Sequence, residues 1–484
     1  MAQNEISKKS GKAIKWSLFT QIVSKLVSPI VNMVLARLLA PEAFGAVATI
    51  NIVITFAEVF TDAGFQKYIV QHEFSDDDEL DKNTNVAFWT NILVSLLFIG
   101  TIVLARNPIA DLVGSPGLGN AIAVSSLNII LVTFASTQTA RYNRDMNFKT
   151  LFYARICTLF VPVVVTIPLA IVMRNYWALV IGTLATNLIN AVVLAAFSKW
   201  KPRLFFRWKI FKEMFSFSAW ILFDSIAVWL TGYIGTFIVG RYLDDYYLGL
   251  YKTAMTTVNS ITNIITTSIT PVMFSQLSRC QDDDAEMKRT FYTYQRLSAI
   301  VLIPLGIGMF VFKDLLTWVM LGDQWTEAIN FVGLWGLISS FVIIFNNYCS
   351  SFYRSKGKPK ISLVAQLIYL SVLIPGLLFA ARDGYVALYL TRSVMSLFAV
   401  ILAFTIMKFV FGFKAVETVL NVAPMIISAI IMGVVGYFMQ FVMESYALHF
   451  VAVFICIIVY FAVLLMIFRK QERKYLICHL CRRF

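Results

Sequence analysis

The sequence predicts an all-α, polytopic membrane protein with about 14 transmembrane helices. Hydrophobic residues make up 59% of the 484-residue chain and charged residues only 14%, a balance far more apolar than that of soluble domains. Apolar stretches of about 20 residues, the length that crosses a bilayer, follow one another with short polar breaks. The predicted spans are 14–37, 44–69, 86–105, 119–139, 151–172, 176–197, 214–240, 247–273, 290–312, 329–352, 361–381, 384–407, 420–441 and 447–468.

The positive charges of the chain gather in alternate segments between these spans. With the N-terminus in the cytoplasm, thirty Lys and Arg residues fall in cytoplasmic segments, six on the opposite side and five inside helices. Cytoplasmic loops of membrane proteins carry such an excess of Lys and Arg. We therefore predict that both termini are cytoplasmic. The net charge of +14 follows from this topology, so nucleic acid is not a predicted partner.

A hairpin near the N-terminus recurs later in the chain. Residues 34–47 read VLARLLAPEAFGAV and residues 238–251 read IVGRYLDDYYLGLY, and an offset of 204 places Gly45 on Gly249. Six helices, an even number, separate the copies, so both face the membrane in the same direction. Such parallel repeats are typical of transporters built from two bundles. We predict one six-helix lobe at 1–213, a second at 214–412, and two further helices with a basic tail at 413–484.

Polar residues form one face on several of these helices. Spacings of i, i+4, i+7 and i+11 place side chains on one side of a helix. Because polar groups that face lipid are costly, these faces predict a cavity inside the protein. The faces comprise Gln21, Lys25, Ser28 and Asn32 in the first helix, Asn51, Thr55, Glu58 and Asp62 in the second, Asp224 and Thr231 in the seventh, and Lys252, Thr256, Asn259 and Asn263 in the eighth.

Ionisable residues within the helices are the main candidates for binding and coupling. We predict that Glu58, Asp62 and Asp224 couple transport to a cation, either H+ or Na+. An internal ion pair between Lys25 and Glu58 is the structural alternative. The predicted substrate-binding residues of the cavity are Gln21, Lys25, Asn32, Arg37, Asn51, Asp224, Arg241, Lys252 and Asn259.

Other charged residues have simpler interpretations. Arg37 and Arg241 recur by the repeat and either fix the outer hairpin corners or contact substrate. Arg155, Arg296 and Arg392 are expected near the cytoplasmic interface, where long cationic side chains reach water.

The loops predict neither an enzyme nor a metal site. The basic segment 198–216 is expected to form a surface helix that places Trp208, Phe211 and Met214 against lipid. Two acidic runs, 75–78 and 281–284, are expected to begin helices rather than to bind a divalent cation. The Cys478-His479-Leu480-Cys481 tail has no second cysteine pair to complete a zinc site, and no nucleotide-binding motif or nucleophile–base constellation occurs.

Several of these segments resemble a known family. They are Lys15-Trp16-Ser17, then LARLLAPEAFGAVA, TDAGFQKYIVQ at 61–71, Tyr142-Asn143-Arg144, and LGLYKTA at 248–254. Together they resemble the Wzx-type polysaccharide transporters, and within them the branch of colanic-acid-exporter-like lipopolysaccharide biosynthesis proteins. The stretch Asp62-Ala63-Gly64-Phe65 is the most specific part of the likeness. Lys252 departs from the family pattern, in which a neutral residue is expected.

The resemblance implies the fold of the multidrug/oligosaccharidyl-lipid/polysaccharide exporter superfamily. It also implies a flippase that moves an undecaprenyl-pyrophosphate-linked oligosaccharide across the bacterial cytoplasmic (inner) membrane by alternating access, without a cofactor. A glycan polymerase and glycosyltransferases are the implied protein partners, beside membrane lipids. A small-molecule or drug exporter, a glycan-assembly scaffold and a membrane enzyme are the alternatives, although a polymerase would need a larger outer loop.

Overall fold

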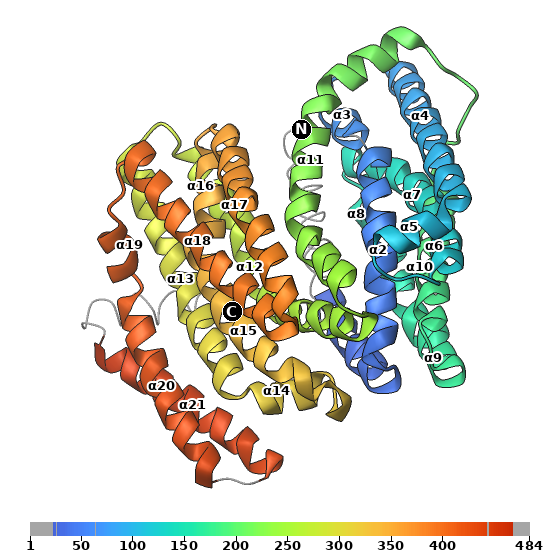
Figure 1. The fold of residues 1–484 in the computed structure, drawn as a ribbon. Coiled ribbons are helices and arrows are strands. Elements are labelled where there is room, and N and C mark those ends of the chain that lie inside the picture. Colours follow the sequence, from blue (N-terminus) through green and yellow to red (C-terminus); the bar gives the residue numbers. More distant parts are fainter. Residues whose placement is uncertain (1–22, 26, 63, 443–444, 468–484) are drawn as a thin grey trace. The chain divides into compact units, whose positions relative to one another are not determined.

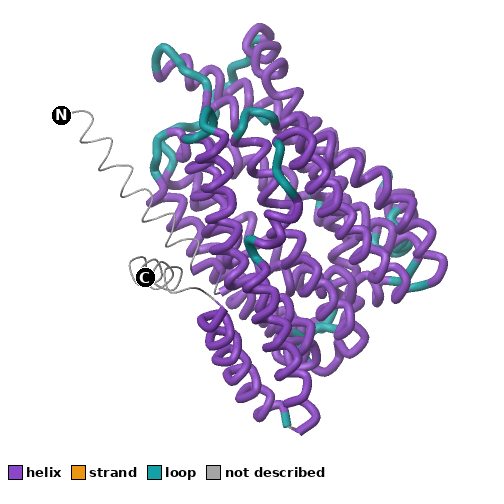
Figure 2. Tube along the Cα trace, turned by 90° about the vertical axis from the view of Figure 1, so that its left-hand side faces the viewer, coloured by secondary structure: helices purple, strands orange, loops and turns teal. Residues whose placement is uncertain are grey.

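The chain is helical almost throughout. A computed structural model describes residues 23–25, 27–62, 64–442 and 445–467, and these ranges contain helices and short connections but no strand. Figure 2 shows how short the connections are relative to the helices. Two compact units divide the chain, Met1–Lys252 and Thr253–Phe484, and each is described by itself. The lobe boundaries predicted at 213/214 and 412/413 stay a prediction.

Twelve helices within the described residues are long and apolar enough to cross a membrane, which supports a multi-pass membrane protein. The predicted count of 14 is not confirmed. One further predicted span, 14–37, lies partly outside the described residues, which are helical at 27–38. The other, 247–273, lies in α12 (Asp245–Arg279), which is 35 residues long but rich in Ser, Thr and Asn. The twelve are Pro41–Thr61, Asp77–Leu104, Gly119–Arg144, Phe148–Met173, Trp177–Phe197, Ile221–Tyr242, Asp284–Val311, Asp323–Ser355, Lys360–Asp383, Tyr385–Phe411, Ala423–Val442 and Tyr446–Ile467.

Figure 1 shows the helices of the first unit. They pack around small apolar cores. Its helices are α2 (Pro41–Asp62), α3 (Phe65–Gln71), α4 (Asp77–Leu104), α5 (Arg106–Leu112), α6 (Gly119–Ser125), α7 (Leu127–Arg144), α8 (Phe148–Val161), α9 (Ile167–Met173), α10 (Trp177–Phe197), α11 (Trp208–Tyr242) and the start of α12.

The second unit has a larger apolar core that includes Phe291, Ile344 and Met425, none of which is exposed to solvent. Its helices are the rest of α12, α13 (Asp284–Val311), α14 (Lys313–Met320), α15 (Ile329–Val342), α16 (Tyr348–Ser355), α17 (Pro359–Ala380), α18 (Tyr385–Phe411), α19 (Ala415–Leu420), α20 (Ala423–Val442) and α21 (Tyr446–Ile467).

The acidic runs begin helices, as predicted. Asp76 is the N-cap of α4, and its carboxylate accepts a hydrogen bond from the Glu79 backbone N–H at 2.7 Å. Asp283 caps α13 in the same way, accepting from the backbone N–H groups of Ala285 and Glu286 at 3.0 Å each. Carboxylates at these positions satisfy free N–H groups and face the positive end of the helix dipole.

The predicted surface helix at 198–216 is wrong in part. Residues 208–216 are the first turns of the 35-residue α11 rather than a separate helix. Trp208 is 68% exposed, as expected for a side chain against lipid, but Met214 is only 1% exposed. Met214 packs into a core with Phe65, Tyr68 and other apolar residues. The amphipathic pattern identified the apolar face, but only the packing shows that this face meets α3 and α4 rather than lipid.

Candidate functional site

The two copies of the repeated hairpin contact each other within the first unit. A Cβ atom added to Gly45 would lie 1.7 Å from the carbonyl oxygen of Asp245, and one added to Gly249 would lie 1.9 Å from the carbonyl oxygen of Pro41. The repeat offset of 204 relates Pro41 to Asp245 and Gly45 to Gly249, so the two contacts are equivalent. Reciprocal contacts of this kind mark an isologous, two-fold arrangement. Only glycine, which has no Cβ, permits backbones to approach this closely.

We call the two contacting segments, at Pro41–Gly45 and Asp245–Gly249, the hairpin corners. A short polar network lies beside them. The Ser115 hydroxyl donates to Asp245 Oδ1 at 2.6 Å, and the Thr49 hydroxyl oxygen lies 3.1 Å from that of Ser115. Thr49 and Ser115 are buried, at 0% and 4% exposure. Gly114, the residue before Ser115, has a φ of +87°, and a Cβ added there would lie 1.9 Å from the Gly240 carbonyl oxygen. The loop after α5 therefore packs tightly against the end of α11 and the start of α12.

Burial raises the pKa of the Asp245 carboxyl, the hydrogen bond from Ser115 partly offsets this, and the neighbouring Asp244 charge adds to it. A raised pKa means that the Asp245 carboxyl binds a proton more tightly when the two corners are packed together than when they are separated. The packed corner should therefore gain stability as pH falls through the raised pKa, level off below the ordinary value of about 3.9, and lose this stability as pH rises.

Spin labels at the exposed positions Ala40 and Tyr242 should reveal this pH dependence. We expect the population with the short inter-label distance to grow on acidification in the wild-type protein. Asp245→Asn keeps the shape but cannot titrate, so its distance distribution should not change with pH. An equal pH response in Asp245→Asn would show that another group is responsible.

An aromatic and polar cluster on α2, α11 and α12 lies on the predicted stripe of the first unit. The Trp229 indole N–H donates to the Thr55 hydroxyl at 3.0 Å, and that hydroxyl donates to the backbone carbonyl oxygen of Asn51. Trp229 stacks on Tyr233 with ring centroids 5.5 Å apart, and Lys252 Nζ lies 4.5 Å from the centre of the Tyr233 ring. These side chains are only partly buried. We call them the Trp229 cluster.

The Trp229 cluster combines the groups that carbohydrate binding requires. Flat aromatic faces, a hydroxyl group, a backbone carbonyl group and one ammonium group lie together among apolar helices. Beside it, Gly232 is exposed, and a Cβ there would meet no atom within 4 Å. Sequence reasoning identified Asn51 and Lys252 but missed the two aromatic residues. Their spacing of i, i+4 on the seventh helix, beside Gly232, was the available signal.

The predicted coupling residues are only partly described. Glu58 is partly buried, and no described residue forms an ion pair with it. The structural alternative of a Lys25–Glu58 ion pair is therefore not seen. Gln21 lies outside the described residues, and the side chains of Asp62 and Asp224 are likewise outside the described part of the structure, although both positions are helical.

Two of the remaining predicted site residues of the first unit, Arg37 and Arg241, lie close to the packed corners in sequence. Asn32, Arg37 and Arg241 are exposed. Arg37 and Arg241 each precede a corner residue, Pro41 or Asp245, by four positions. This placement is compatible with either role that the sequence left open.

In the second unit, Asn259 belongs to a separate cluster. The Trp335 indole N–H donates to Asn259 Oδ1 at 3.3 Å, and the guanidinium carbon of Arg392 lies 5.5 Å from the centre of the Trp335 ring. Arg392 also donates to the Tyr369 hydroxyl at 2.9 Å and is only 7% exposed. The prediction that the Arg392 side chain reaches water is therefore wrong. Its side chain turns into the bundle because aromatic faces and a hydroxyl receive it there.

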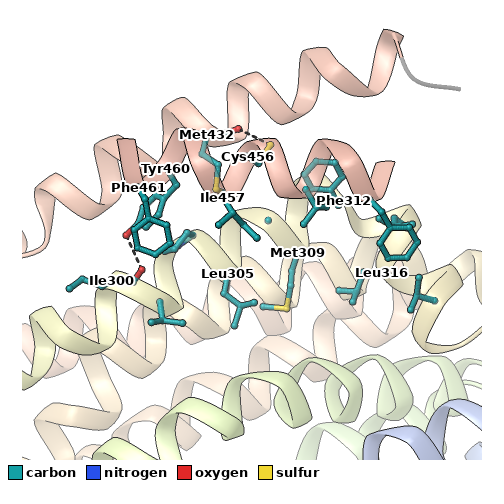
Figure 3. Close-up of a pocket in the computed structure, with 17 residues that line it drawn as sticks. Ile300, Leu305, Met309, Phe312, Leu316, Met432, Cys456, Ile457, Tyr460 and Phe461 are labelled. Carbon is teal, nitrogen blue, oxygen red and sulfur yellow. Dashed lines mark hydrogen bonds between the residues drawn. The ribbon is translucent and has the colours of Figure 1, made fainter. Parts of the chain in front are cut away.

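A cavity of about 470 Å³ opens in the second unit between α13, α14, α20 and α21. Figure 3 shows Leu305 and Met309 on one side and Ile457 and Phe461 on the other. The Tyr460 hydroxyl donates a hydrogen bond to the Ile300 backbone carbonyl oxygen at 2.8 Å, so it has no hydrogen left for a ligand. A lining of this kind suits a hydrocarbon chain, and it offers no group for sugars or phosphate.

Two motifs that carry the family resemblance meet in space. Gly64, with φ +79°, ends α2 and starts α3. One guanidinium nitrogen of Arg144 donates to the carbonyl oxygens of Ile69 and His72, at 2.8 and 2.6 Å, and the guanidinium carbon lies 4.6 Å from the centre of the Phe74 ring. Arg144 thus satisfies carbonyl groups at the end of α3, which the helix itself leaves unpaired. These motifs therefore have a structural role that their sequence alone did not reveal.

Comparisons with known proteins agree with this architecture. WzxC, a lipopolysaccharide biosynthesis protein of Escherichia coli (strain K12), is 20% identical over 410 residues, which cover 82% of each chain. The solved structure of the lipid II flippase MurJ in an inward closed conformation superposes with a TM-score of 0.75 at 15% identity, covering 93% of this chain and 98% of MurJ.

A multidrug resistance MATE transporter of the MOP superfamily, solved in an inward-facing conformation, superposes with a TM-score of 0.62 at 10% identity, covering 83% of this chain and 95% of that one. The model of the family described as polysaccharide biosynthesis protein matches residues 34–330, which is more than half of the chain. The matched range contains both copies of the hairpin, the Trp229 cluster and the Arg144 contacts, and the chain belongs to this polysaccharide biosynthesis protein family.

Proposed function

We propose that this protein is a flippase that moves a lipid-linked oligosaccharide across the bacterial cytoplasmic membrane by alternating access, with both termini in the cytoplasm. The Trp229 cluster is the observation that carries the proposal. An ammonium group is costly within a bilayer, and here it lies beside stacked aromatic rings and a hydroxyl group that suit a polar ligand. The family and the MurJ-like fold support the same conclusion.

Each part of such a cargo has a counterpart in the chain. Sugars stack on Trp229 and Tyr233 and bond to Asn51 and Thr55. The pyrophosphate is neutralised by a cationic group, for which Lys25 and Lys252 are the candidates of the first unit. The undecaprenyl chain stays in the apolar phase, for which the cavity between α13 and α21 offers hydrocarbon surface.

Transport does not require a nucleotide. An anionic headgroup that moves outward from a negative interior gains roughly 2.3 kcal/mol per charge per 100 mV. Glu58, Asp62 and Asp224 remain the candidates for coupling to H+ or Na+.

Glycosyltransferases would supply the cargo, and a polysaccharide polymerase would consume it. The packed hairpin corners would close one side of the cargo path and separate when it opens to the other side.

Proteoliposomes that contain a fluorescent undecaprenyl-pyrophosphate oligosaccharide test the proposal. The wild-type protein should exchange the label between leaflets faster than empty liposomes do. Lys25→Ala should slow exchange about tenfold, because a charge-assisted hydrogen bond contributes on the order of 1.5 kcal/mol or more. Lys25→Arg should retain most of the rate.

Two further variants separate a specific effect from a general one. Lys209→Ala removes a positive charge at an exposed position at the start of α11 and should leave the rate unchanged. Trp229→Ala should slow a long glycan more than a single sugar, and Trp229→Phe should restore part of the rate. No exchange above empty liposomes, under an imposed potential or an ion gradient, would favour a small-molecule exporter or a scaffold instead.

A further inference from the structure

Arg392 is a buried cation that its surroundings do not neutralise. It lies in the third turn of α18, is only 7% exposed, and forms no ion pair with any described residue. One terminal nitrogen donates to the Tyr369 hydroxyl at 2.9 Å, and the guanidinium group lies over the Trp335 ring. Its Nε atom is buried and has no acceptor in the described part of the chain.

The helices around Arg392 cannot supply a counter-charge. Tyr369 and Trp335 place α17 and α15 next to α18 within the second unit, and Asn259 of α12 contacts Trp335 on α15. Residues 253–279 of α12 and all of α15, α17 and α18 contain no Asp or Glu. A buried charge in this position needs an anion or becomes very costly.

We propose that Arg392 holds a resident small monovalent anion of chloride size inside the second unit. The Nε–H of Arg392 donates to this anion. The Tyr369 hydroxyl, which accepts a hydrogen bond from Arg392, keeps its own proton for the same ligand. The near-complete burial of Arg392 favours a single ion over a phosphate group attached to a lipid. The anion neutralises the guanidinium group and thereby fixes the Trp335–Asn259 hydrogen bond on the polar face of α12.

This site is independent of the cargo proposed above, so its test does not use transport. The purified full-length protein in detergent or nanodiscs is heated in buffers in which gluconate is replaced by chloride at constant ionic strength. Wild-type Tm should rise with chloride and then saturate, by about 3 °C or more at large excess over Kd. Arg392→Met has similar length and no charge, so its Tm should not respond to chloride.

Two controls make the result specific. Arg382→Met, which removes an exposed arginine just before α18, should retain the full chloride response. If Arg392→Met does not fold, saturable quenching of tryptophan fluorescence by iodide provides a second test. This quenching should be present in the wild-type protein, compete with chloride and be lost in Trp335→Phe. A Tm that does not depend on chloride, or that responds to inorganic phosphate but not to chloride, would overturn the proposal, as would quenching without competition.

Discussion

Gly45→Ala and Gly249→Ala should each prevent the two hairpin corners from packing. The added Cβ would lie within 2 Å of a backbone carbonyl oxygen, 1.7 Å for Gly45 and 1.9 Å for Gly249, and a backbone atom cannot turn aside as a side chain can. Overpacking of this kind costs about 1–3 kcal/mol, which lowers the ratio of packed to open corners roughly fivefold to more than a hundredfold. Because the contacts are reciprocal, either change separates the same pair of corners, and the double variant should cost less than the sum.

Labelling of a cysteine at Val113 with a membrane-impermeant maleimide measures this effect. Val113 is 3% exposed beside the packed corners, so the label should react slowly in the otherwise wild-type protein and much faster in either alanine variant. Leaflet exchange of the cargo should fall in parallel, because one of the two access states is lost. Gly100→Ala is the matched control, since a Cβ there meets nothing within 4 Å. Labelling and exchange equal to those of Gly100→Ala would show that the corners need not pack for transport.

Arg144→Met should destabilise the region around α3. The substitution removes two charge-assisted hydrogen bonds, to the Ile69 and His72 carbonyl oxygens, and the contact with the Phe74 ring. Hydrogen bonds to charged groups contribute about 1.5–3 kcal/mol each, and the partial exposure of Arg144 reduces this, so we expect a loss of about 2–4 kcal/mol. Tm should fall, and amide hydrogen exchange should accelerate most in α3.

Arg289→Met provides the comparison for this experiment. Its side chain is 82% exposed and forms only a long ion pair with Glu286, at 3.9 Å, so removing it should change stability little. Arg144→Lys keeps the charge but cannot offer the same planar donor group to two carbonyl oxygens, so it should restore only part of the loss. Unchanged exchange protection in α3 of Arg144→Met would contradict the structural role that we assign to this motif.

The sequence by itself determined the features that depend on neighbouring residues. Runs of apolar residues predict helices because transfer into a bilayer and backbone hydrogen bonding are set residue by residue along the chain. Asp76 and Asp283 cap helices because a cap acts on N–H groups two or three positions away. The repeat also identified Gly45 and Gly249 as equivalent positions before any contact was known.

Only the tertiary structure decided which of these residues meet. The depth of Arg392, the burial of Met214 and the stacking of Trp229 on Tyr233 each depend on how a helix is rotated and shifted against its neighbours. Many rotations bury similar apolar area, so periodicity does not distinguish between them. The reciprocal glycine contacts also show that a sequence pattern does not specify which helices touch. The repeat established that the corners are equivalent, but whether they touch was decided by packing between helices about 200 residues apart in the chain.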